Sequence, residues 1–71
     1  MREEIFAPMA SKIFQICVNV GDTVAEDDLL IKLDAMKMEI PIIAPVGGVV
    51  KEIRVKVNDE VESDDVLMIL E

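Results

Sequence analysis

The chain has 71 residues, of which 52% are hydrophobic and 31% are charged, and its formal net charge at pH 7 is −8. A chain of this size forms one small domain with a marginal core, and its composition fits neither a disordered acidic tail nor a membrane protein. The acidic charge disfavours nucleic-acid binding, while the absence of His and the presence of a single Cys, Cys17, exclude His-based nucleophile pairs, thiolate metal sites and internal disulfides.

Neither a leader nor a membrane anchor is predicted. The longest uncharged run, residues 40–50, is 11 residues long and contains Pro41 and Pro45, whereas a membrane-spanning helix needs about 20 apolar residues. The apolar stretch behind the charged N-terminus is too short for a signal peptide. We therefore expect a cytoplasmic protein that does not insert into a membrane.

The predicted elements are all β-strands. Val (10 residues) and Ile (9 residues) are abundant, and β-branched side chains favour strands. Apolar and polar residues alternate around Ile16 and Ile53, which indicates strands with one buried and one exposed face. In chain order, we predict strands at 3–8, 12–19, 23–25, 29–35, 38–44, 48–56, 60–62 and 66–70.

The second half of the chain repeats the first after a shift of 37 residues. Residues 7–34 align with residues 44–71 without a gap, and 11 of the 28 positions are identical. Four short strands cannot bury a face alone, so two half-repeats, 5–34 and 42–71, predict an all-β fold: a flattened barrel or sandwich of two four-stranded antiparallel sheets with internal pseudo-two-fold symmetry. The same symmetry predicts that the two termini lie close together, far from residue 37.

The apolar residues that match between the halves are the predicted core. They are Ile16, Val18, Val20, Val24, Leu30, Leu33, Ile53, Val55, Val57, Val61, Leu67 and Leu70.

Turn signals between the predicted strands also recur in both halves. Gly21-Asp22 matches Asn58-Asp59, and Asp27-Asp28 matches Asp64-Asp65. Gly and Asn are the residues that best tolerate positive φ. A feature present twice is expected to serve the fold, so we interpret these aspartates as solvated turn residues. A calcium or magnesium site is the alternative, although such a site needs several convergent oxygens.

The connection between the two halves, residues 35–41, occurs only once. The apolar runs on both sides leave about two turn residues, Met36 and Lys37, where a two-residue hairpin normally uses Asn-Gly or Asp-Gly. A departure from this preference points to a functional reason. Lys37 has no neighbouring base that would make it a nucleophilic catalyst. We predict that it is modified by another enzyme, which grips Met36 and Met38; an ordinary charged turn residue is the alternative.

These residues resemble a family. Ala35-Met36-Lys37-Met38 resembles the Ala-Met-Lys-Met motif of biotinyl domains, also called biotin carboxyl carrier domains. The resemblance covers the whole chain: 7–9 is similar to the family's first strand, 20–24 to its valine-glycine-aspartate turn, and 44–53 to the segment behind the attachment site. It implies a single biotinyl domain over 1–71, with a hairpin at 35–38. It also implies biotin bound through an amide to Lys37, with Ala35, Met36 and Met38 completing the attachment motif.

The function implied by the resemblance is that of a non-catalytic carrier. Biotin on Lys37 would act as a swinging arm that moves a carboxyl group between active sites of a biotin-dependent carboxylase, transcarboxylase or decarboxylase. The implied partners are a biotin ligase and biotin carboxylase, carboxyltransferase or decarboxylase subunits. The sequence departs from the family at Asp34, where many members have Glu, and at Ser11, where Gly is common. It also lacks the inserted hairpin that forms a protruding thumb in some members.

Three alternatives remain from the sequence. A lipoyl domain of a 2-oxo acid dehydrogenase resembles the same fold with the same Lys placement, but usually has an acidic residue before the Lys, where this chain has Met36. An unmodified interaction module, such as those in efflux adaptors, has no need of Met-Lys-Met. An independent enzyme is disfavoured by the missing catalytic residue types.

Overall fold

The computed structural model describes residues 2–71, so Met1 lies outside the described residues. Eight strands are present: β1 (Glu3–Phe6), β2 (Ser11–Ile16), β3 (Thr23–Val24), β4 (Leu29–Ala35), β5 (Met38–Ile43), β6 (Gly48–Ile53), β7 (Glu60–Val61) and β8 (Val66–Leu70). They confirm the eight predicted strands, although β2 and β6 each end three residues earlier than expected. Residues 2–71 contain no helix whose length and hydrophobicity would allow it to span a membrane.

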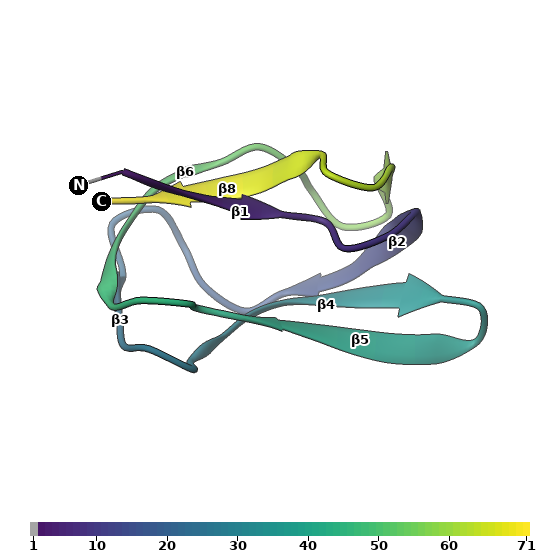
Figure 1. Ribbon diagram of the computed structural model, residues 1–71, viewed down its shortest axis with the longest axis horizontal. Helices are drawn as coiled ribbons and strands as arrows, with labels where there is room; N and C mark the ends of the chain where they lie inside the picture. Colours follow the sequence, from purple (N-terminus) through teal and green to yellow (C-terminus); the bar gives the residue numbers. More distant parts are fainter. Residues whose placement is uncertain (1) are drawn as a thin grey trace.

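The strands form two four-stranded antiparallel sheets that face each other (Figure 1). One sheet has the order β1-β8-β6-β3 and the other has the order β5-β4-β2-β7. Each strand of the first sheet has its repeat counterpart at the same place in the second, which confirms the predicted two-fold relation. The sheets nevertheless mix the halves, because β1 and β3 pair with β8 and β6 of the other half.

The turns follow the same symmetry. Gly21 and its counterpart Asn58 have φ angles of 96° and 78°, and Asp27 and its counterpart Asp64 have φ angles of 74° and 71°. Left-handed backbone is costly for most residues but is tolerated by Gly, Asn and Asp. The repeated turn residues therefore serve the backbone at equivalent places.

The repeated aspartates close these turns. Asp22, Asp28, Asp59 and Asp65 each accept, through Oδ2, a hydrogen bond from the backbone N–H three residues earlier, at 2.9, 2.8, 3.0 and 2.8 Å. Carboxylates used in this way satisfy turn N–H groups. The structure therefore supports the turn interpretation, and residues 2–71 hold no group of three or more side chains placed to bind a metal ion.

A continuous cluster of buried apolar side chains fills the space between the sheets. It includes six of the predicted core residues, and four more pack against it while remaining partly exposed. The buried six are Val24, Leu30, Leu33, Val61, Leu67 and Leu70, and the partly exposed four are Ile16, Val18, Ile53 and Val55.

Two predicted core residues are exposed instead. Val20 and Val57 are 61% and 48% accessible. They follow the early ends of β2 and β6 and directly precede the left-handed residues Gly21 and Asn58. Strand alternation fixes the direction of a side chain only within the ladder. The predicted burial of Val20 and Val57 was therefore wrong, because both lie beyond the observed ends of their strands.

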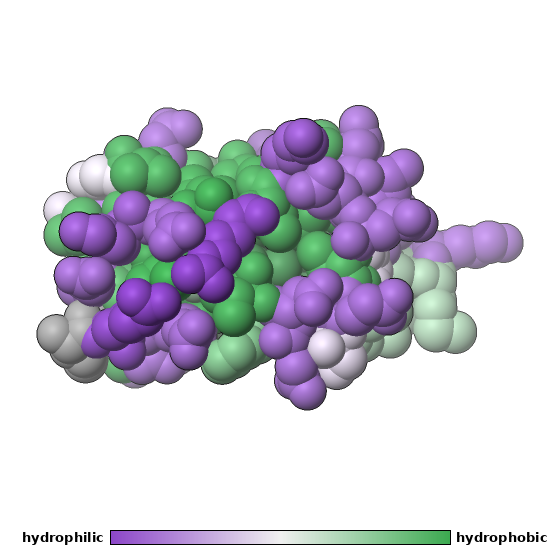
Figure 2. Space-filling view, turned by 90° about the horizontal axis from the view of Figure 1, so that it is seen from above, coloured by the Kyte–Doolittle hydropathy of each residue, from purple (hydrophilic) through white to green (hydrophobic). Residues whose placement is uncertain are grey.

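Strand β8 shows the opposite deviation, because Leu67, Met68, Ile69 and Leu70 are all fully buried. Irregularities in its pairing with β1 and β6 interrupt simple alternation. Ile69 lies outside the main cluster, between its cross-strand partners Glu4 and Glu52. Figure 2, seen from the side of β1, β8 and β6, shows apolar surface in the middle of this face with polar side chains around it.

Candidate functional site

The hairpin formed by β4 and β5 ends in a two-residue turn. Ala35 and Met38 are the last cross-strand pair, so Met36 and Lys37 alone connect the strands, as predicted. Met36 has a φ of 51° and Lys37 a φ of 65°, as a type I′ turn requires. A residue with a Cβ is destabilised in this conformation by roughly 1–2 kcal/mol. The turn is therefore made of residues that its backbone does not favour.

This strained pair is unique within the repeat. The other left-handed residues of the described chain form the matched pairs given above, whereas Met36 and Lys37 lie in the connection between the two half-repeats. Features that serve the fold occur in both halves. The Met36–Lys37 turn is consequently the leading candidate for function.

The turn lies at one end of an elongated molecule, whose extents are 32 × 17 × 17 Å (Figure 1). The strands nearest the two ends of the sequence, β1 and β8, lie side by side and are paired from Glu3 with Leu70 onward. In Figure 1 they end at the left, opposite the β4–β5 turn. This is the expected arrangement of the two poles, although the predicted proximity of Met1 itself lies outside the described residues.

The side chains of residues 35–38 have contrasting surroundings. Met36 and Met38 are 85% and 65% exposed, whereas Ala35 is buried at the base of the turn. Lys37 is exposed, and the two ion pairs recorded among residues 2–71 join other residues: Lys32 with Glu39 at 3.9 Å, and Arg54 with Glu52 at 3.1 Å. The Lys37 amine is thus accessible at the tip of a hairpin that is anchored in the sheet.

An accessible primary amine suits covalent attachment of a carboxylic acid through an amide bond. The long, flexible Lys stem would give an attached group freedom to move, while the β4–β5 ladder from Leu29 to Met38 holds the tether point in a fixed position. These residues therefore fit a covalently attached cofactor.

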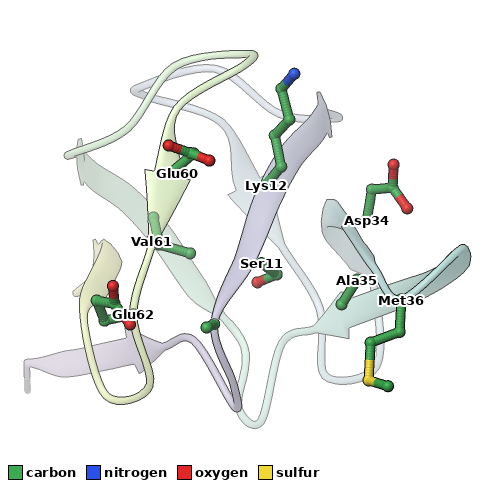
Figure 3. A pocket seen from close by; sticks show the side chains of 9 residues that line it. Ser11, Lys12, Asp34, Ala35, Met36, Glu60, Val61 and Glu62 are labelled. Carbon is green, nitrogen blue, oxygen red and sulfur yellow. The ribbon is translucent and has the colours of Figure 1, made fainter.

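A pocket of about 350 Å³ opens beside the turn. It is lined by the beginning of β2, the end of β4, strand β7 and Met36 (Figure 3). Figure 3 shows Lys12 between Glu60 on one side and Asp34 on the other, with Val61 and Ala35 below them. The site therefore consists of an exposed amine and a small, partly charged depression at the base of the same hairpin.

Sequence reasoning placed Lys37, Met36, Met38 and Ala35 together but did not identify the pocket residues Lys12, Glu60 and Val61. A signal was present in the repeat, because Lys12 and Glu60 match Val49 and Thr23 in the other half. A charged residue that replaces an apolar or neutral counterpart is an unrepeated feature. That β2 and β7 lie beside the turn became evident only from the sheet order.

The chain is similar in sequence to proteins of known type. Residues 3–70 match the family model described as biotin-requiring enzyme. The biotinylated protein TB7.3 homolog of Mycolicibacterium smegmatis is 37% identical over 43 residues, which are 61% of this chain and 61% of that protein. The biotin carboxyl carrier protein of Streptococcus mutans is 54% identical over 37 residues, 52% of this chain and 28% of that protein. The chain thus spans less than two thirds of the length of these relatives.

Solved structures show the same fold. The urea carboxylase of Kluyveromyces lactis matches all of this chain with a TM-score of 0.94 and 28% identity, and the match covers 6% of that enzyme. A single-chain, multi-domain long-chain acyl-CoA carboxylase matches 96% of this chain with a TM-score of 0.91 and 22% identity, over 7% of its own length. At that lower identity, the second likeness shows the fold alone.

Proposed function

The chain belongs to the family of biotin-requiring enzymes as a biotin carboxyl carrier domain, and from this premise we propose that Lys37 is the residue to which biotin is joined. The observation that carries the proposal is the exposed amine on the unrepeated, left-handed Met36–Lys37 turn. Every other left-handed turn of the described chain has a symmetric partner that serves the fold. Met36, Met38 and Ala35 complete the attachment motif.

Attachment requires a second enzyme. A biotin ligase uses ATP to convert the carboxyl group of biotin into biotinyl-adenylate, and pyrophosphate is released. The Lys37 amine then attacks the activated carbonyl, so that an amide forms and AMP and a proton leave. Lys37 loses its positive charge, which takes the formal net charge from −8 to −9. The exposed thioether side chains of Met36 and Met38 supply apolar, adaptable surface for the ligase.

The proposed role of the domain is transport without catalysis. Bound biotin supplies a ring nitrogen that accepts and releases a carboxyl group in the active sites of partners. We assign as partners a biotin carboxylase together with a carboxyltransferase or decarboxylase. The chain itself keeps the tether point fixed and leaves the Lys37 side chain free to reach outward. Tethering replaces a diffusional encounter between carrier and active site with a local one.

The shape of the domain supports this role. The turn stands at the pole opposite the paired strands β1 and β8. A protein attached through those strands would leave the Lys37 pole unobstructed. We place the carrier in the cytoplasm, in keeping with its free, exposed thiol at Cys17, since exported proteins meet oxidising conditions that favour disulfides.

Mass spectrometry tests the proposal directly. The domain is co-expressed with a biotin ligase in the presence of biotin, and its intact mass is compared with that of the unmodified chain. We expect the increment of one biotin, mapped by peptide fragmentation to Lys37. A lipoyl increment, or a biotin adduct on a different lysine, would contradict the assignment.

A further inference from the structure

We propose that the pocket beside the turn docks the bicyclic ring of biotin attached to Lys37, so that the ring rests on its own domain between visits to partner active sites. The inference rests on the proposed function, because it requires biotin at Lys37. It goes further by assigning a ligand to pocket residues on β2, β4 and β7.

The pocket occupies a fork between two strands. β2 and β4 are paired as far as Lys12 with Asp34, and this is the last pair of their ladder. Beyond that point Ser11 pairs with Val61 of β7, while Ala35 pairs with Met38 of β5. The two strands therefore separate at the base of the Lys37 hairpin, and the pocket of about 350 Å³ lies where they part (Figure 3).

The main-sheet ladder ends at the equivalent pair at the opposite pole. There, Val49 and Glu71 correspond to Lys12 and Asp34, and they exchange backbone hydrogen bonds of 2.7 and 2.9 Å. Gly48 lies against this pair so closely that a Cβ would come 2.9 Å from the carbonyl oxygen of Glu71. The counterpart of Gly48 is Ser11, which has a Cβ. The Lys37 pole differs in its charged lining, because Lys12 and Glu60 stand where the other pole has Val49 and Thr23.

The lining of the fork complements a ureido ring fused to a sulfur-containing ring. Lys12 offers N–H donors for the ureido carbonyl, and the Glu60 and Asp34 carboxylates offer acceptors for its two N–H groups. Ala35, Met36 and Val61 supply apolar contacts for the carbon and sulfur atoms of the bicycle. Lys12 and Glu60 are cross-strand partners, yet they are absent from the ion pairs recorded among residues 2–71. Their charged groups thus remain available to a ligand.

The tether makes even a weak site effective. Met36 lines the pocket and is the chain neighbour of Lys37, and the Lys stem plus the valeryl chain of biotin spans about 13 Å when extended, comparable to about four residues of backbone. A short flexible tether gives an effective concentration of about 1 mM. A site with a dissociation constant of about 1 mM would therefore be about half occupied.

The test compares ¹H–¹⁵N NMR spectra of the domain bearing biotinyl-Lys37 with those of the domain bearing acetyl-Lys37. Acetylation removes the same charge and forms the same amide bond but provides no ring. We expect the backbone amide chemical shifts of residues 10–12 and 60–62 to differ between the biotinylated and the acetylated domain. The amides of the turn should differ as well. Shift differences confined to residues 35–39 would overturn the docking proposal.

Two substitutions probe the pocket with residues that the opposite pole already uses at the matching positions. Lys12→Val copies Val49 and Glu60→Thr copies Thr23. Loss of one charge-assisted hydrogen bond weakens binding about tenfold, which reduces the ring-dependent shifts to about one fifth. Lys51→Val and Glu26→Thr are the matched controls, because they remove the same charges outside this pocket. Equal reductions in the control variants would overturn the role of the pocket.

The outcomes separate the two proposals. The intact mass of every sample is measured first. A chain that takes up no biotin at Lys37 overturns both the proposed function and the docking site. A chain that carries biotin but gives the spectrum of its acetylated counterpart beyond the turn overturns only the docking site.

Discussion

Ala35 and Met38 face each other as the final pair of the β4–β5 ladder, and their pairing holds both intervening residues in the left-handed conformation. The buried Ala35 fixes one side of the turn in the sandwich. The exposed Met38 forms the other side. The turn thus combines a fixed base with a freely accessible tip.

Replacing Lys37 with Arg should abolish biotin attachment and leave the fold unchanged. Arg keeps the charge but does not form the amide. An exposed position without an ion pair contributes little to stability, so the free energy of unfolding should change by less than about 0.5 kcal/mol. Streptavidin blotting and urea denaturation measure the two effects. Lys51→Arg and Lys56→Arg should keep full labelling; labelling that survives in Lys37→Arg would refute the site.

Replacing Met36 with Asn should stabilise the domain. Met36 has a φ of 51°, and Asn is preferred at the first position of a type I′ turn because it tolerates this conformation. The expected gain in the free energy of unfolding is about 0.5–1 kcal/mol, measured by urea denaturation. Met9→Asn serves as the comparison, because Met9 is also accessible but does not have a positive φ. A loss of stability in Met36→Asn would contradict this account of turn strain.

Truncating Leu33 or Leu70 to Ala should be severely destabilising. Both side chains are fully buried and they are counterparts in the repeat, so each substitution should cost about 2–5 kcal/mol. In a domain of this size that loss approaches the whole free energy of unfolding. Val20→Ala is the control, because Val20 is exposed and its truncation should cost under about 0.5 kcal/mol. Similar effects at all three positions would be inconsistent with the core described here.

Replacing Gly48 with Ala should destabilise the pole opposite Lys37. The new Cβ would lie 2.9 Å from the Glu71 backbone oxygen, which accepts a 2.7 Å hydrogen bond from the Val49 N–H. Overpacking of this kind costs about 1–3 kcal/mol. Gly47→Ala is the matched control, since its Cβ would approach no closer than 3.4 Å to another atom. Thermal unfolding of the two variants checks the difference; an unchanged midpoint in Gly48→Ala would show that the strands can separate there.

The sequence predicted the strands and their symmetry because both depend on local pattern. Alternation and turn residues are properties of neighbouring positions, the 37-residue repeat is found by comparing the sequence with itself, and the Met36–Lys37 turn follows from the length of the two flanking runs. Burial was less predictable. Val20 is exposed because it lies beyond the end of its ladder, and Ile69 is buried between its cross-strand partners Glu4 and Glu52. Both outcomes depend on contacts between segments that are distant in the sequence.

The pocket was beyond sequence reasoning for the same reason. Lys12, Asp34 and Glu60 come from three strands that are far apart in the chain. Their meeting requires β7 of the second half to pair with β2 of the first. The charged residues Lys12 and Glu60 in place of Val49 and Thr23 were visible in the repeat, but their position beside the turn follows only from the sheet order.

The exchange of strands between the halves bears on how the chain is synthesised. β1 and β3 find their pairing partners only in β8 and β6, so the first half cannot close the sandwich when it leaves the ribosome. Lys37 emerges 33 residues before Leu70, the last residue of β8. At about 5–20 residues per second, this interval lasts about 2 to 7 s. During that time the hairpin bearing the lysine has only β2, its upstream neighbour, to pair with and lacks β7 and the strands β6 and β8 of the facing sheet. A ligase that requires the complete sandwich must wait for translation of β8.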